Sequence, residues 1–526
     1  MTRLIYCPTG GFYMKLLLSL VLTLLLHAPV LAEPLSIRIL HLNDFHGYVR
    51  PTGGSAISSS LGGAARLAER INQLRSEKPS LLLSAGDMIQ GDSWTNLSSG
   101  ESVIDLMNLL QFDAITTGNH EFDFGQEILM KRIKQASFPL LAANVKGLDG
   151  LKPYTILNRG GVRVGIIGLI TDETPETSHP RNTVGLAFTK PLAKVYELLR
   201  ELRGKTDLIV LLTHLGHSED RELAERLSQS PDGGNLLIIG GHSHTRVERP
   251  VKIGANYVAQ AWEHGKTIGV IDVTVDRGLI TSCIGRLDEI TPDLGNGEPK
   301  VAALVKSYDT KSDSALSSIV GVANFDLQQT GIRQKETDLG NLIADIVRET
   351  SGAQVAIING GSIRTGIRQG PVTMRDIYAM LPFNNYIVAV RLSGRQLRET
   401  LEHGVSGVER GEGRFPQVSG LTFSFDPTKP VGKRVGRILV SGAALEENRD
   451  YVVATLDFMA AGGDGYQAFG NAIRSGGDYS DTGGALHSSR LMFNDPGHWL
   501  RDIVADYLEN NGVLSSGSQG RIMELR

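Results

Sequence analysis

Six short polar clusters, rich in aspartate, asparagine and histidine, follow apolar runs in the first half of this 526-residue chain. One such residue after an apolar run is usually a structural hydrogen-bonding group or a helix cap. Five clusters that carry Asp, Asn or His within one half of the chain are hard to explain by caps, and together they favour a shared metal site. The candidate ligands are Asp44, His46, Asp87, Asn119, His214, His242 and His244.

The mixture of ligand types indicates which metals would suit such a site. Carboxylate, imidazole and amide oxygen without thiolate favour Zn, Mn, Co or Fe and exclude a structural zinc knuckle. Asp87 has two carboxylate oxygens and is the natural bridge between two ions. Two divalent ions, balanced by Asp44, Asp87 and a bridging hydroxide, leave a net charge of about +1, which would attract a phosphate ester and supply a nucleophile at neutral pH.

The apolar runs that precede these clusters are predicted to be strands. Between Leu35 and about Val275 they alternate with helix-like stretches such as Gly63–Arg75, which favours a layered α/β domain with buried sheets. In a doubly wound α/β domain the loops after the strands converge on one crevice, so the clusters can meet. The predicted strands are Ser36–Leu42, Ser80–Ser84, Ala114–Thr116, Val162–Ile170, Leu208–Leu212 and Leu236–Ile239.

The length of the chain predicts two domains, because one hydrophobic core does not grow to this size. Turn-forming residues from Thr291 to Pro299, followed by a polar, helix-prone stretch, place a linker at residues 288–316. The catalytic domain is therefore expected at 33–287, and a second α/β domain at 317–526. Its predicted elements are the helices Asp338–Glu349 and Trp499–Leu508 and the strands Val355–Ile358, Tyr386–Leu392, Leu421–Phe425 and Tyr451–Leu456.

The N-terminus has the pattern of a secretory signal peptide at residues 1–32. Lys15 precedes an apolar run, Leu16–Leu26, and small residues end at Ala32. The run is too short for a comfortable membrane span. We therefore expect an exported protein, periplasmic or secreted after cleavage near Ala32, without a stable membrane anchor. Cys283 would then be the single remaining cysteine, interpreted as a small packed residue.

The second half carries glycine-dense segments with aromatic or arginine members. Aromatic rings between glycines could stack on a nucleobase, and arginines such as Arg364 and Arg368 could bind phosphate with two N–H groups. The alternative is that Phe415 and Tyr466 are ordinary core or rim aromatics. The net charge of −4 argues against a general nucleic-acid binder, so the expected partner is a small-molecule nucleotide.

The order of the motifs Asp-x-His, Gly-Asp, Gly-Asn-His-Glu-Phe-Asp, Thr-His and Gly-His-Ser-His resembles the calcineurin-like metallophosphoesterase family. The longer segments 41–47 and 118–125 resemble its exported 5′-nucleotidase and UDP-sugar hydrolase branch, and the similarity covers nearly the whole mature chain. The resemblance implies an N-terminal four-layer αββα metallophosphoesterase domain. It also implies a C-terminal α/β nucleotidase domain.

The resemblance divides the candidate ligands between two ions. One ion would be held by Asp44, His46, Asp87 and His244. The other would be held by Asp87, Asn119, His214 and His242. Some relatives have glutamine in place of His244, which bears on metal preference.

His120 and Asp123 resemble the catalytic dyad of this family. A carboxylate three residues after a histidine can hold one imidazole nitrogen while the other faces the phosphoryl group. The cation would stabilise charge on the phosphoryl oxygens or assist the leaving alcohol. The alternative is that His120 only braces Asn119.

In the second domain, Phe415 and Tyr466 match the pair that stacks the base in this family. Arg364 begins the arginine set that faces phosphate or ribose. Some relatives have an acid in the segment that corresponds to Gln467–Ala472, which contains none here. The predicted substrate-binding residues are Asn359, Arg364, Arg368, Arg410, Phe415 and Tyr466.

The function favoured by these patterns is hydrolysis of 5′-nucleotides by metal-bound hydroxide, with UDP-sugars or dinucleotide diphosphates as further substrates. Two enzyme alternatives share the metal core: a 2′,3′-cyclic nucleotide phosphodiesterase with 3′-nucleotidase activity, and a thiosulfohydrolase. From another class, the chain could be a metal-dependent nucleotide-binding protein without turnover, which the His120–Asp123 pair disfavours.

Overall fold

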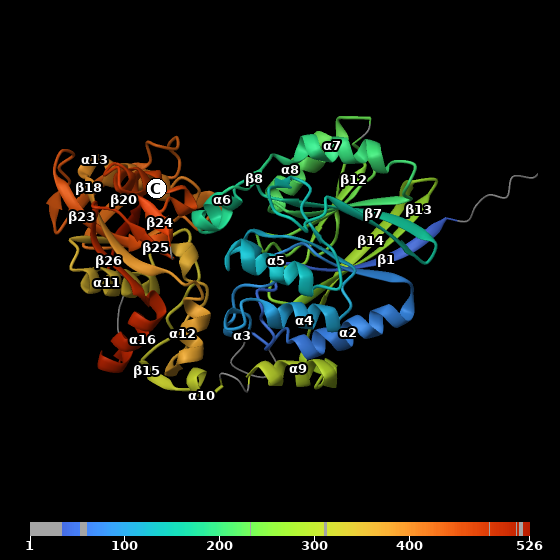
Figure 1. Cartoon of the computed structure of the whole chain (residues 1–526), viewed down its shortest axis with the longest axis horizontal. Helices are drawn as coiled ribbons and strands as arrows, with labels where there is room; N and C mark the ends of the chain where they lie inside the picture. The colour runs from blue at the N-terminus through green and yellow to red at the C-terminus, as the bar shows by residue number, and fades with distance from the viewer. Residues whose placement is uncertain are drawn as a thin grey trace, which may run out of the picture.

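A computed structural model shows two lobes side by side, the N-terminal one mostly in blue to green and the C-terminal one in yellow to red (Figure 1). The expected signal peptide lies outside the part of the chain that the model describes. Within that part, no helix is both long and apolar enough to cross a membrane. The described residues are 34–52, 60–231, 233–309, 313–482, 484–511, 513–514 and 519–525.

The N-terminal domain contains two six-stranded mixed sheets. The first has the order β14 (Leu279–Glu289), β13 (Thr267–Asp276), β1 (Leu35–Leu42), β2 (Ser80–Ser84), β3 (Ala114–Thr116), β4 (Leu140–Leu141). The second has the order β11 (Val251–Ile253), β12 (Asn256–Gln260), β10 (Leu237–Gly240), β9 (Leu208–His214), β7 (Val162–Ile170), β6 (Tyr154–Arg159). Strands β1 to β4 are parallel to one another, and so are β7, β9, β10 and β12.

The two sheets pack face to face, and helices cover their outer faces. Ile39 and Leu83 of the first sheet and Val210 and Ile239 of the second are fully buried between them. The inner strands β2 and β9 are buried along their whole length and consist mainly of apolar residues, whereas the outer strands β14 and β6 are partly exposed. The expected αββα domain is confirmed, with two stacked sheets in place of one doubly wound sheet. The covering helices are α2 (Ala64–Glu77), α4 (Glu101–Leu109), α5 (Gln126–Gln135) and α9 (Pro299–Asp309) on the first sheet, and α7 (Pro191–Leu202) and α8 (His217–Ser228) on the second.

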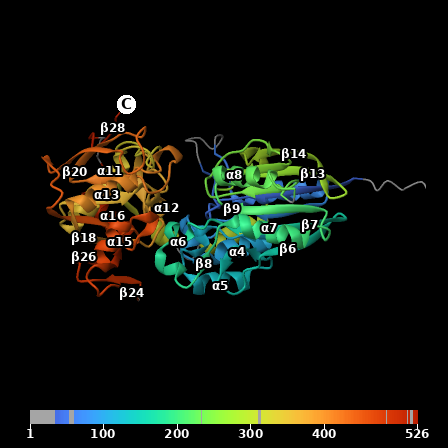
Figure 2. The same ribbon diagram turned by 90° about the horizontal axis from the view of Figure 1, so that it is seen from above.

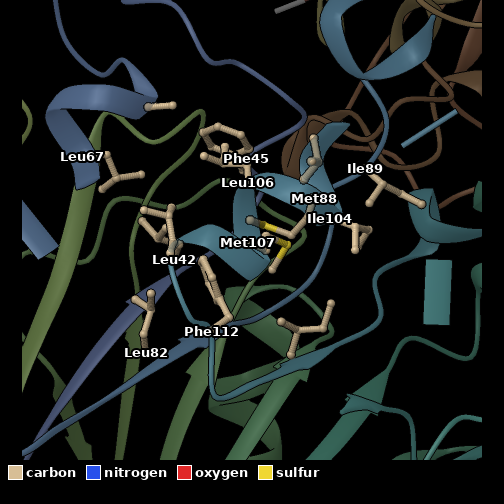
Figure 3. Packing of buried hydrophobic residues seen from close by; sticks show 14 of the residues in the cluster. Leu42, Phe45, Leu67, Leu82, Met88, Ile89, Ile104, Leu106, Met107 and Phe112 are labelled. Carbon is tan, nitrogen blue, oxygen red and sulfur yellow. The ribbon is translucent and has the colours of Figure 1, made fainter. Parts of the chain in front are cut away.

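The core between the first sheet and its helices reaches up to the loops that carry the candidate ligands (Figure 3). Phe45 lies between Asp44 and His46 in the sequence and is 2% exposed in this core. Met88, which follows Asp87, is also 2% exposed there. Close packing resists displacement of these two side chains. The core therefore fixes the backbone of the loops that carry the candidate ligands.

A helix inside the predicted linker packs on the first domain. Val301 of α9 is fully buried against α2 and α4, and Trp94 Nε1 donates to Val305 O at 3.2 Å. The backbone N–H of Glu298 donates to Ala65 O at 2.8 Å. Residues 299–309 are therefore part of the outer layer of the first domain.

The C-terminal domain is built on a five-stranded sheet with helices on both faces. Its order is β19 (Pro416–Ser419), β16 (Val355–Asn359), β23 (Asp450–Leu456), β18 (Tyr386–Ser393), β26 (Leu491–Trp499). One face is covered by α11 (Asp338–Ser351), α12 (Met374–Met380) and α16 (Leu500–Asn511). The other is covered by α13 (Gly394–Gly404), α14 (Asp457–Ala460) and α15 (Gln467–Arg474). The predicted two-domain α/β fold is confirmed.

Smaller sheets complete both domains. A four-stranded sheet has the order β22 (Ala443–Ala444), β21 (Val435–Val440), β20 (Leu421–Phe425), β28 (Ile522–Glu524). A three-stranded sheet has the order β17 (Gly370–Thr373), β15 (Ile319–Ala323), β27 (Val513–Leu514). The two-stranded sheets are β5 (Val145–Lys146) with β8 (Ala187–Phe188) and β24 (Ser480–Thr482) with β25 (Ala485–His487).

The domains contact each other through α6 (Thr174–Thr177), which lies beside the short helix η7 (Gly463–Gly465) and is seen between the lobes in Figure 2. Next to this contact, Arg181 of the first domain forms ion pairs with Asp457 at 2.9 Å and Asp481 at 3.2 Å of the second. His179 Nε2 is 3.3 Å from the same carboxylate of Asp457, which is fully buried.

A second contact joins the domains beside α3 (Ser93–Asn96), where Asn96 Nδ2 donates to Pro382 O at 3.0 Å. Between the two contacts lies a cavity of about 1000 Å³ that residues of both domains line.

Candidate metal centre and interdomain cavity

The candidate ligands lie together at one edge of the two stacked sheets, where β1, β2, β3, β9 and β10 end. Backbone hydrogen bonds join the loops: Asp44 N–H donates to Gly86 O and His46 N–H to Asp87 O, both at 3.0 Å. The carboxylate of Asp44 accepts the backbone N–H of His242 at 3.0 Å. Asp44 belongs to a loop of the first sheet and His242 to a loop of the second, so this bond fixes the two sheets relative to each other at the site.

Five of the candidate ligands have a left-handed backbone conformation, which is uncommon for residues other than glycine. Aspartate and histidine tolerate it better than most, and its concentration here indicates a functional constraint on the backbone. Gly118 lets the loop after β3 approach Asp87 closely. Any larger residue would clash, because a Cβ at this position would lie 2.1 Å from Asp87 Oδ1. The left-handed ligands, with φ from 50° to 78°, are Asp44, His46, Asp87, His242 and His244.

Asp44, His46 and His244 form the first ligand cluster, with potential ligand atoms within 4.8 Å of one another. His244 Nε2 is 3.5 Å from Asp44 Oδ1 and 3.3 Å from His46 Nε2. His46 Nδ1 donates to Gln90 O at 2.7 Å, which leaves the Nε2 lone pair facing the cluster.

Asp87, His214 and His242 form the second cluster, also within 4.8 Å. Asn119 Oδ1 completes it, at 3.3 Å from His214 Nε2 and 3.0 Å from His242 Nδ1. His214 Nδ1 donates to Ala85 O at 2.6 Å, so its Nε2 points inward.

Asp87 lies between the two clusters. Its Oδ2 is 3.1 Å from His214 Nε2 in one cluster and 3.9 Å from His46 Nε2 in the other. Its Oδ1 accepts the backbone N–H of His120 at 3.0 Å. One oxygen therefore faces both clusters, which is the geometry that a bridging ligand requires.

The protonation of the histidines is set by burial and by the nearby carboxylates. Burial lowers the pKa of His46 well below its usual value and that of His242 to about 3, so both rings are neutral, as metal ligands must be. Burial also disfavours the charged form of His214, but Asp87 and Asp44 outweigh it and raise its pKa to about 10. Carboxylates that attract a proton this strongly would also attract a divalent cation, so the donor set fits metal ions.

His120 lies at the rim of the second cluster with its side chain held from behind. Its Nδ1 donates to Asp123 Oδ2 at 2.6 Å, and Ser178 Oγ donates to Asp123 Oδ1 at 2.7 Å. Burial lowers the pKa of His120, but Asp123 and Asp87 outweigh this and raise it. The free nitrogen, Nε2, is 4.0 Å from Asp87 Oδ2, and the ring lies 5.7 Å from Phe383 of the second domain.

Two acidic residues that sequence reasoning missed hold the site. The carboxylate of Glu121 accepts the backbone N–H groups of Asp87 at 2.9 Å and Met88 at 2.7 Å, so it fixes the loop after β2. Glu263 Oε2 accepts from His244 Nδ1 at 2.7 Å. Both lie inside the polar clusters of the sequence, which was the available signal.

Three of the predicted substrate-binding residues, Asn359, Arg364 and Arg410, line the interdomain cavity. The Arg364 guanidinium lies 5.9 Å above the Phe383 ring, near His120. Arg368 is exposed and is not among the described residues that line the cavity. The structure therefore brings Arg364, but not Arg368, to the metal centre.

Phe415 and Tyr466 lie in the hydrophobic core of the second domain, each 1% exposed. The Tyr466 hydroxyl donates to Arg414 O, and its ring packs edge-on against His403 at 5.0 Å. Neither Phe415 nor Tyr466 is among the described residues that line the interdomain cavity. In this structure both aromatics are covered.

Comparisons with known proteins match both halves of the chain. Residues 37–246 match the calcineurin-like phosphoesterase family, and residues 317–471 match the 5′-nucleotidase C-terminal domain family. The snake venom 5′-nucleotidase of Naja atra is 31% identical over 92% of this chain and 98% of its own length. This chain belongs to the 5′-nucleotidase family of metallophosphoesterases.

A solved structure of a 5′-nucleotidase precursor from Thermus thermophilus resembles this chain over nearly the whole length of both proteins. It is 31% identical and has a TM-score of 0.82, with 93% of this chain and 99% of that chain covered. The trifunctional nucleotide phosphoesterase protein YfkN of Bacillus subtilis is 32% identical over 82% of this chain. The chain spans only 32% of the length of YfkN and 38% of that of another Bacillus subtilis relative. Membership of this family implies divalent metals, and the two clusters of aspartate and histidine fit a metal site.

Proposed function

We propose that this chain is an exported 5′-nucleotidase that hydrolyses phosphate esters of nucleotides with two divalent metal ions. The observation that carries the proposal is the position of Asp87, whose Oδ2 faces both ligand clusters at the wall of a cavity lined by both domains. The apolar run Leu16–Leu26 supports export to the periplasm or the medium.

The proposed ligands of the two ions share Asp87. The first ion would be held by Asp44, His46, Asp87 and His244. The second would be held by Asp87, Asn119, His214 and His242. The donor set suits Zn, Mn, Co or Fe. When bound, the ions would polarise the phosphoryl oxygens and lower the pKa of the attacking water.

The side chains of the chain itself orient the phosphate and stabilise its charge. His120 would donate from Nε2 to a phosphoryl oxygen or to the leaving alcohol, because Asp123, itself held by Ser178, accepts from Nδ1 on the opposite side of the ring. Arg364 would bind the phosphoryl group from the second domain, where its guanidinium lies beside Phe383. Arg410 and Asn359, which also line the cavity, would contact the rest of the nucleotide.

We assign the nucleobase to Phe415 and Tyr466 on the family resemblance. Both rings are covered in this structure, so a base would stack on them only after the residues that cover them move. Stacking would then contribute about 1–3 kcal/mol and would tolerate different bases. Arg368, exposed and away from the cavity lining, is the weakest member of the proposed substrate set.

The experiment that tests the proposal combines metal analysis of the purified protein with phosphate release from AMP, UDP-glucose and 2′,3′-cyclic AMP. The proposal predicts two equivalents of metal and release from AMP. Turnover confined to 2′,3′-cyclic AMP and 3′-nucleotides would support the cyclic phosphodiesterase alternative. Metal binding without product from any of the three would contradict nucleotide hydrolysis and favour the binding protein or the thiosulfohydrolase.

A further inference from the structure

The part of the chain between β7 and α7 lies between the His120–Asp123 pair and the second domain. It contains α6, seen between the two lobes in Figure 2, and a second short helix, η3 (Pro180–Thr183). Each of these helices has four residues, too few to be stable alone, so contacts with the rest of the protein determine their position. Residues 178–182, which include the start of η3, are called the connecting segment below.

Both ends of the connecting segment hold Asp123. Ser178 is 1% exposed, and its Oγ donates to Asp123 Oδ1 at 2.7 Å. Asn182 Nδ2 donates to the backbone oxygen of Asp123 at 3.0 Å. The other carboxylate oxygen of Asp123 accepts from His120 Nδ1 at 2.6 Å. The connecting segment therefore fixes the side chain and the backbone of the residue that orients the His120 ring.

The middle of the connecting segment contacts the second domain. Arg181 forms ion pairs with Asp457 at 2.9 Å and with Asp481 at 3.2 Å. His179 Nε2 lies 3.3 Å from the carboxylate of Asp457. The backbone N–H of Arg181 donates to His179 Nδ1 at 3.4 Å, which links the two side chains that face the second domain. Five consecutive residues thus contact Asp123 on one side and two carboxylates of the other domain on the opposite side.

Asp457 is itself held firmly in the second domain. It is fully buried at the start of α14, and its Oδ1 accepts the backbone N–H of Tyr386, the first residue of β18, at 3.1 Å. A buried carboxylate that loses a positive partner is strongly unfavourable. The contact with Asp457 therefore keeps Arg181, and with it the middle of the connecting segment, in one position.

We propose that docking of the second domain positions the His120–Asp123 pair through the connecting segment, with Arg181 and Ser178 as positioning residues. The ion pairs of Arg181 hold Ser178 against Asp123, and the His120 ring then keeps one orientation. When the domains separate at this contact, the ring loses that orientation and turnover falls, while the metal ligands on their own loops stay in place. This inference rests on the proposed function, because it needs the proposed role of His120 at the phosphoryl group.

The test is a double-mutant cycle between Arg181 and Asp123, measured as kcat for AMP in the full chain supplied with Mn²⁺. Arg181→Met should lower kcat about tenfold, because the His120 ring is misaligned, and should leave bound metal at the wild-type level. In an Asp123→Ala background, the same substitution should change kcat by less than about twofold, since the residue through which it acts is absent.

Two further variants sharpen the test. Ser178→Ala removes the hydrogen bond to Asp123, and its combination with Arg181→Met should lose little more than either variant alone. Arg163→Met is the matched control, because it removes an arginine that pairs with Asp207 within the first domain. This control should keep wild-type kcat.

The outcomes separate this inference from the proposed function. If the wild-type chain releases no phosphate from AMP, the proposed function fails. If it does, and Arg181→Met lowers kcat by the same factor with and without Asp123, only the positioning role is overturned, because Arg181 then acts by another route. A loss of less than about twofold in the wild-type background, or a loss of bound metal, also overturns it.

A second substitution keeps the test decisive if Arg181→Met fails to fold. Arg181→Lys keeps the charge but cannot pair with both carboxylates in the same planar geometry. It should lower kcat about threefold in the wild-type background and leave it unchanged in the Asp123→Ala background. Equal losses in the two backgrounds would again contradict the positioning role.

Discussion

His120 and Asp123 form a pair in which the carboxylate fixes one imidazole nitrogen and leaves the other facing the ligand cluster. Replacing His120 with asparagine removes the proton donor and leaves the ligand Asn119 in place. We expect His120→Asn to lower kcat by about 10²–10⁴-fold while the bound metal stays at the wild-type level. Phosphate release and metal analysis on one preparation check both parts.

The matched control is His498→Asn. His498 also bonds an aspartate three residues away, Asp495 at 2.9 Å, but on the exposed surface. This variant should keep wild-type turnover. Normal turnover in His120→Asn would instead support the alternative that His120 only braces Asn119.

Glu263 gives His244 a partner that the other histidine ligands lack, since His46 and His214 donate to backbone carbonyls. A carboxylate partner orients the ring and makes it a stronger donor to a metal. Glu263→Gln should therefore weaken one metal site by about 10–100-fold and leave the other unchanged. Titration of Co²⁺ against a competing chelator measures this, with the exposed Glu248→Gln as control. Equal weakening of both sites would argue against the assignment of His244 to one cluster.

Helix α9 shows how packing converts a linker-like sequence into part of a domain. Val301 is fully buried on the first domain, whereas its neighbour Ala302 is exposed. Val301→Asp would place a charge in that core and should reduce the free energy of unfolding by more than about 3 kcal/mol. Thermal unfolding measures the effect, and Ala302→Asp should change it little. Similar stabilities for the two variants would mean that α9 does not contribute to the core.

The six predicted strands of the first domain were recognisable because each is a mainly apolar run. β2 and β3 begin and end at the expected residues. The packing of α9 was not predictable, because an amphipathic surface helix and a linker helix have the same composition, and its partners α2 and α4 are distant in the sequence. Stacking of two sheets, in place of one doubly wound sheet, depends on the same kind of long-range contact.

In the candidate site, too, some features could be predicted from the sequence and others could not. The metal-ligand clusters were recognisable, because several ligand types follow successive strands, and the structure brings them together. Glu263 lies in one of the polar clusters and was still missed, because the sequence does not show which side chain an acid in a loop will contact. The burial of Phe415 and Tyr466 could not be predicted from the sequence. Glycines next to an aromatic residue do not show whether its ring faces a cavity or a hydrophobic core.

Charged contacts join the two domains beside α6. Asp457 is fully buried and is paired with Arg181 across the domain interface. Arg181→Met would remove the arginine partner of this buried carboxylate and leave His179 beside it, at a cost of about 3 kcal/mol. We expect the domains to separate more readily, seen as a larger radius of gyration in X-ray scattering.

The control for this prediction is Arg163→Met. The partner of Arg163 is Asp207, within the first domain, and the arginine is exposed. Its loss should leave the radius of gyration unchanged. If Arg181→Met behaves in the same way, other contacts between the domains suffice to hold them.

The left-handed backbone of Asp44, His46, Asp87, His242 and His244 also limits how the site can change over evolutionary time. Asparagine and aspartate adopt this conformation at little cost, whereas β-branched residues strongly resist it. A β-branched residue at any of these positions would therefore strain the backbone, whatever its chemistry. A laboratory search for altered metal selectivity should accordingly sample aspartate, asparagine, histidine and glycine first, and should place other ligand types at Asn119 and His214, whose backbones are not left-handed.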